Sequence, residues 1–136
     1  MESFLGEIRN NLSLDPKLRE LAMCGVAVLN GAEYEFFHHA PPFIKAGGTE
    51  EQVQALRLIG QPSFPKALFS DVENDAAELT FQMTRNIQVD SALMKRLQAT
   101  LGNTDTAELV TVVAAYNMVS RFLIALDVNP EEHPPE

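Results

Sequence analysis

Apolar residues recur three and four positions apart along most of this chain, which is the spacing that one face of an α-helix produces. No stretch shows the alternation of apolar and polar residues that is typical of a half-buried strand. Turn and capping residues divide the pattern into segments that we expect to be helices, at about 16–29, 32–45, 49–58, 70–85, 91–101 and 104–128. The pattern therefore predicts an all-α fold of six helices.

Local signals mark most of the predicted helix ends. Asp15 followed by Pro16 is typical of a helix start, and Asn30-Gly31 of a helix end. Later starts carry two capping boxes and an aspartate N-cap: Thr49 with Gln52, Ser70 with Glu73, and Asp90. Pro41 and Pro42 interrupt the second segment, and we expect them to kink or split it, because proline removes a backbone donor.

The last predicted helix, 104–128, is apolar on nearly all sides. Such a helix is buried within its own domain or between subunits. The closing segment, 129–136, contains three prolines and three glutamates, which predicts a disordered acidic tail. We therefore expect one helical domain over residues 1–128.

Composition narrows the classes of function. A length of 136 residues with 46% hydrophobic content fits one globular domain. The net charge of −9 would repel nucleic acids and anionic membranes, so neither is an expected partner. We find no apolar signal core and no run of about 20 apolar residues, which predicts a cytoplasmic protein. The single cysteine, Cys24, excludes an intrachain disulfide and suits a reducing compartment.

The segment 33–39 combines acids, histidines and aromatic residues within two helical turns. Glu35 and His39 are four residues apart, so on a helix they share a face and form a pair able to pass protons near neutral pH. The alternative is an ordinary surface hydrogen bond. His38 would point about 100° away from His39, so the two histidines cannot face the same pocket. Tyr34 is expected in the core or in a pocket wall.

Two further charged residues lie within apolar helical segments. Glu20 either points inward or is a solvated residue near the helix start. Arg121 lies four residues after Asn117 in an apolar run, and a buried arginine needs a partner. It is either a clamp for an anionic substrate or a structural ion pair to one of three candidate acids, Glu20, Glu33 or Glu35.

Glu35 and His38 also have the Glu-x-x-His spacing of di-iron carboxylate proteins. Such sites need two of these motifs and two further glutamates on facing helices. This chain has no second Glu-x-x-His, so we do not expect a metal centre.

Several motifs together resemble the carboxymuconolactone decarboxylase family. They are Leu18-Arg19-Glu20-Leu21-Ala22, Asn30-Gly31-Ala32-Glu33-Tyr34-Glu35 with His38-His39, Lys45-Ala46-Gly47, Thr49-Glu50-Glu51-Gln52-Val53, and the closing run from Tyr116 to Leu126. The resemblance implies the all-helical fold that this family shares with alkylhydroperoxidase D. It also implies assembly into a homo-oligomer.

In the redox members of the family, a glutamate precedes a Cys-x-x-Cys pair that is followed by a histidine. Glu20 and His39 match the glutamate and the histidine, whereas Ala32 and Glu35 stand at the two cysteine positions. Cys24 is at neither position. Peroxide reduction by disulfide cycling is therefore not available by that route.

For the decarboxylase branch, the resemblance implies loss of carbon dioxide from a small lactone acid without a cofactor. We expect Glu20, Glu35 and His39 to be catalytic. Substrate contacts are expected from Tyr34, His38 and Arg121, of which the last two are candidates for supplying positive charge. Two alternatives remain open: an antioxidant relative of alkylhydroperoxidase D whose thiol is external or lost, and a non-catalytic oligomeric helical protein.

Overall fold

The computed structural model describes residues 2–127, which form six α-helices and one 3₁₀ helix and contain no β-strand. In chain order these are α1 (Glu2–Asn10), α2 (Pro16–Asn30), α3 (Glu33–Lys45), α4 (Glu50–Leu56), η1 (Lys66–Leu68), α5 (Asp71–Arg85) and α6 (Ser91–Ala125). The prediction of an all-helical fold is confirmed. The predicted disordered tail, 129–136, lies outside the described residues.

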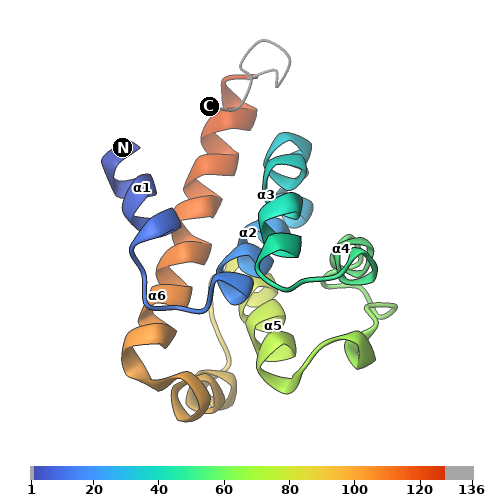
Figure 1. The fold of residues 1–136 in the computed structure, drawn as a ribbon, viewed down its shortest axis with the longest axis vertical. Coiled ribbons are helices and arrows are strands. Elements are labelled where there is room, and N and C mark those ends of the chain that lie inside the picture. The colour runs from blue at the N-terminus through green and yellow to red at the C-terminus, as the bar shows by residue number, and fades with distance from the viewer. Residues whose placement is uncertain (1, 128–136) are drawn as a thin grey trace.

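Helix α2 is the centre of the fold. It packs against α3, α5 and α6, and ten of its 15 residues are buried. Helix α6 runs along the long axis of the molecule, with α1 to one side in this view and α3 to the other (Figure 1). A residue on the inner side of α2 is therefore surrounded by other helices.

The predicted capping signals form as expected. The side chain of Asp15 accepts a hydrogen bond from the amide of Lys17 at 3.0 Å. Both capping boxes are complete, and Asp90 caps α6. Gly31 ends α2 in the left-handed conformation, with φ at 68°, which glycine adopts without strain. These local interactions fix where the helices begin and end.

The structure differs from the predicted helices in two places. Helix α1 was missed, because its apolar pattern is short and its burial is concentrated at Ile8, which is 2% exposed. Helix α3 continues through Pro41 and Pro42, so the prediction of a split is wrong. The two prolines leave the backbone carbonyls of Phe37 and His38 without their helical donors. Phe37 is exposed and His38 is half-buried, so solvent can hydrate the Phe37 carbonyl.

The two predicted helices 91–101 and 104–128 meet without a loop and together form α6. Gly102, with φ at 84° and ψ at 169°, is not helical and marks the break between them. By length and composition α6 is also able to cross a membrane, with 39% of its most apolar window buried. This is weak evidence for a span, because a core helix meets the same criterion, and α6 packs on α2 and α5.

A buried polar network ties α6 to two other helices. The side-chain oxygen of Asn117 accepts hydrogen bonds from Asn30 at 2.9 Å and from Arg121 at 2.7 Å. Its side-chain nitrogen donates to the hydroxyl of Thr84 at 3.0 Å. Asn30 also donates to Ser120 at 2.8 Å. The network therefore fixes the end of α2 against α5 and α6.

We expect Asn117→Leu to lower the free energy of unfolding by about 2 to 4 kcal/mol, because it leaves buried polar partners on two helices without their bonds. Urea denaturation at a fixed protein concentration measures the change. The control is Thr111→Ala, an exposed position on the same helix, which should change it by less than about 0.5 kcal/mol. Equal effects of the two substitutions would contradict a structural role for the network.

Candidate acid–base site

A two-residue connection brings α2 and α3 together. After Gly31 turns the chain, the amide of Ala32 donates to the carbonyl of Ala27 at 2.8 Å, and α3 begins at the next residue. The two helices then pack against each other. Glu20, in the first half of α2, thereby lies beside His39, in the middle of α3.

His39 lies between two carboxylates. Its Nδ1 is 2.7 Å from Oε2 of Glu20, and its Nε2 is 3.3 Å from Oε2 of Glu35. Glu20 is 4% exposed, Glu35 7% and His39 5%. The predicted pairing of Glu35 with His39 is therefore present and buried, so it is not a surface hydrogen bond. Glu20 points inward, and its solvated alternative is excluded.

The two carboxylates determine the protonation state of the imidazole. Burial alone would lower the pKa of His39, but the hydrogen bonds and charges of Glu20 and Glu35 outweigh it and raise this pKa from 6.5 to about 9. His39 is therefore protonated at neutral pH, and each of its N–H groups donates to one carboxylate. The site holds a transferable proton in the interior of the protein.

Two arginines that sequence reasoning missed lie close to this group. The guanidinium of Arg19 is 3.5 Å from Oε1 of Glu20, and its Nε is buried without a hydrogen-bond partner. Arg9, on α1, hydrogen-bonds Tyr116, whose ring meets the His39 ring edge-on at 5.1 Å. Burial raises the pKa of Tyr116 to about 12, although Arg9 acts in the opposite direction. The tyrosine therefore stays neutral beside the imidazolium.

In the sequence, the only indication that Arg19 lies near the site was its position next to Glu20. Arg9 could not be found from the sequence, because the helix that carries it was not predicted. Both side chains bring positive charge to the side of the site that faces α1 and α2.

Of the predicted substrate contacts, Tyr34 and His38 lie next to the site. Their rings stack at 5.4 Å, and His38 meets His39 edge-on at 5.9 Å. Arg121 is exposed and bonds to Asn117, so the structure does not bring it to Glu20, Glu35 or His39. The expectation of a buried arginine is wrong because the last turns of α6 are largely exposed.

Cys24 is fully buried on α2. Burial, and to a smaller extent the charge of Glu20, raises the pKa of its thiol well above the usual range. Because the thiolate is the reactive form, this cysteine is a poor nucleophile.

The side chains of Glu20, Glu35 and His39 do not point toward one shared position where a metal ion could lie. The two carboxylates contact different nitrogens of the imidazole. Within the described part of the chain, no group of three or more His, Cys, Asp or Glu side chains is arranged to hold a metal ion. What the arrangement offers chemically is proton transfer.

The family model of the carboxymuconolactone decarboxylase family matches residues 1–78, more than half of the chain and all of the region that carries Glu20, Glu35 and His39. The chain therefore belongs to the carboxymuconolactone decarboxylase family. Its helices form the all-α, alkylhydroperoxidase D-like fold. No curated protein matches the chain.

The raised pKa of His39 makes stability depend on pH. The pKa is about 9 in the folded protein and 6.5 ordinarily, so the stabilisation is complete below about pH 6.5 and is lost as the pH rises through 9. We expect the free energy of unfolding to fall by roughly 3 kcal/mol over this window, measured by urea denaturation. His39→Gln should remove the decline, and the neighbouring control His38→Gln should retain it. An unchanged decline in His39→Gln would assign it to another group.

Proposed function

We propose that this protein is an enzyme that needs no cofactor and uses acid–base chemistry on a small carboxylate or lactone, with His39 as the proton donor. One observation supports this above all: His39 is held in the interior between two carboxylates, at 2.7 Å and 3.3 Å, and they raise its pKa to about 9. A group with this environment is suited to give a proton to a carbanion-like intermediate.

The two carboxylates have different roles in the proposal. Glu20 makes the shorter contact and fixes the orientation of the imidazole through Nδ1, as the acid of a catalytic triad does. Glu35 makes the longer contact, to Nε2, and its side chain is the more exposed of the two. A substrate would therefore meet His39 on the Nε2 side.

In the proposed step, the bond between the substrate's ring carbon and its carboxylate breaks, and carbon dioxide leaves. The electron pair stays on the carbon as an enolate, and the Nε2 proton of His39 adds to that carbon. His39 is then neutral, and it regains its proton from solvent through Glu35. No electron acceptor or donor is needed for this balance.

Arg19 favours an anionic substrate. Its Nε is buried without a partner, so an incoming carboxylate or enolate oxygen would satisfy it. In this proposal Arg19, rather than Arg121, supplies the positive charge. Tyr34 and His38 form the neighbouring wall.

The thiol alternative has less support. Ala32 and Glu35 stand where the redox members carry cysteines, and Cys24 is buried with a raised pKa. A peroxidase would need a thiol from another molecule. In the non-catalytic alternative, the contacts of His39 with Glu20 and Glu35 would serve only to hold α2 and α3 together.

Turnover of a panel of small lactone carboxylates, followed as release of carbon dioxide, tests the proposal. We expect His39→Gln to lower kcat by about 100-fold or more, because the proton donor is lost. The control Thr111→Ala, at an exposed position on α6, should stay within a few-fold. Activity of the unaltered protein should decline above about pH 9 as His39 loses its proton. Absence of turnover across the panel, or full activity in His39→Gln, would overturn the proposal.

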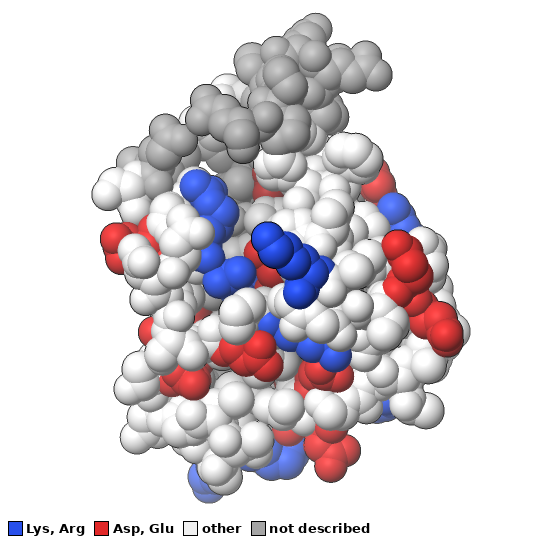
Figure 2. Space-filling view, in the orientation of Figure 1, with Lys and Arg blue, Asp and Glu red and all other residues white. Residues whose placement is uncertain are grey.

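We also propose that the protein is a cytoplasmic homo-oligomer without a nucleic-acid partner. Apolar side chains on the last turns of α6 and directly after it are 43% to 60% exposed, which favours a protein interface: Met118, Phe122, Ile124 and Leu126. In Figure 2, lysine and arginine side chains are interspersed with acidic ones on the face shown. Such a surface does not favour a phosphate backbone.

Sedimentation velocity tests the interface. We expect Phe122→Glu to dissociate the oligomer, because it places a charge within the apolar surface of α6. The control is Ile87→Glu, which alters an apolar side chain that is 79% exposed and lies between α5 and α6. A monomeric parent protein, or dissociation by both substitutions alike, would contradict this interface.

A further inference from the structure

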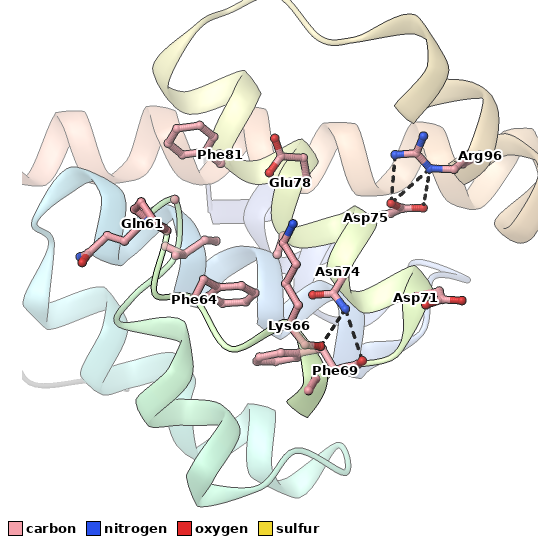
Figure 3. A pocket seen from close by; sticks show the side chains of 15 residues that line it. Gln61, Phe64, Lys66, Phe69, Asp71, Asn74, Asp75, Glu78, Phe81 and Arg96 are labelled. Carbon is pink, nitrogen blue, oxygen red and sulfur yellow. Dashed lines mark hydrogen bonds and ion pairs between the residues drawn. The ribbon is translucent and has the colours of Figure 1, made fainter.

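A second site is suggested by a large hollow beside α5. It has a volume of about 1010 Å³ and lies between the loop after α4, η1, α5 and the first part of α6 (Figure 3). Glu20, Glu35 and His39 do not line it. Its size matches cavities that hold small molecules.

Two opposite charges project into the hollow without neutralising each other. Lys66 comes from η1 and Glu78 from α5, and no hydrogen bond or ion pair joins them (Figure 3). The Lys66 ammonium makes no ion pair within residues 2–127. The carboxylate of Glu78 accepts from Gln82, its neighbour on the same helix, at 3.0 Å. Both charges are therefore available to a ligand.

An unsatisfied acceptor lies in the same wall. The side-chain nitrogen of Asn74 donates to the backbone carbonyls of Lys66 at 3.0 Å and of Phe69 at 3.3 Å. Its side-chain oxygen is buried without a donor and is turned toward the Lys66 side chain (Figure 3). Buried polar atoms without partners are rare, so this oxygen points to a ligand that carries N–H groups.

Aromatic rings form the apolar part of the hollow. Phe64 and Phe69 stack with ring centres 5.1 Å apart, and Phe81 lines the hollow from α5. Gly60 allows the loop to lie against Phe81, since a Cβ at this position would be 2.5 Å from the ring. The walls therefore suit a flat or branched apolar group.

The arginine that lines this hollow already has an acidic partner. Arg96 pairs with Asp75, with their nearest atoms 3.3 Å apart. This leaves Lys66 as the cation for an incoming anion, and Glu78 with Asn74 as acceptors for an incoming ammonium.

We propose that this hollow binds an α-amino acid with an aromatic or apolar side chain. The carboxylate of the amino acid pairs with Lys66, and its ammonium donates to Glu78 and Asn74. The side chain lies against Phe64 and Phe81. This assignment is independent of the chemistry at His39.

Isothermal titration calorimetry of the full chain with L-phenylalanine tests the proposal. Two analogues that each lack one charge are the comparison: 3-phenylpropionate has no ammonium, and 2-phenylethylamine has no α-carboxylate. We expect each analogue to bind about tenfold or more weakly than phenylalanine, because each loses a charge-assisted interaction. Equal affinity for 3-phenylpropionate would indicate a simple anion site and overturn the proposal.

Substitutions of the two charged residues test whether phenylalanine binds in this hollow. Lys66→Met and Glu78→Gln should each weaken phenylalanine binding by about tenfold, since each removes a charge at an exposed position. The control Lys95→Met, an exposed lysine that does not line the hollow, should leave binding unchanged. Absence of saturable binding up to about 10 mM phenylalanine, or insensitivity to both substitutions, would reject the site. His39→Gln should bind phenylalanine normally, which separates this test from that of the acid–base site.

Discussion

The pairing of His39 with Glu20 and Glu35 is the constraint on which the rest of this structure depends. A buried ion pair is tolerated only where both partners are well placed, because taking charges out of water is costly. Glu20 comes from α2, and the other two residues come from α3. Loss of either carboxylate would leave one N–H of the buried imidazolium without its acceptor. The register of these two helices is therefore fixed by charge as well as by packing.

The remaining helices protect that pairing from water. Helix α6 places Tyr116 against the imidazole, and α1 places Arg9 against Tyr116. The Asn117 network holds the far end of α2. Shielding and alignment together allow three ionisable groups to remain ordered in the interior.

The parts of the structure that depend on neighbouring residues could be predicted from the sequence. Caps such as Asp15 and the contact between Glu35 and His39 follow from spacing alone. The contact of Glu20 with His39 joins residues 19 positions apart, and only the family resemblance assigned the two residues to one site. Arg121 was wrongly expected to be buried, because spacing does not show how far α6 extends beyond its neighbours. Arg9 required knowledge of how α1 folds back on the core.

The turn at Gly31 divides the site between two helices, with Glu20 on α2 and both Glu35 and His39 on α3. Glu20 and His39 form a proton-holding pair across the helix hairpin, and position 35 lies one helical turn before the histidine. The Glu20–His39 contact does not involve the side chain at position 35, so a substitution there would change the second acceptor of the imidazole and leave the first in place.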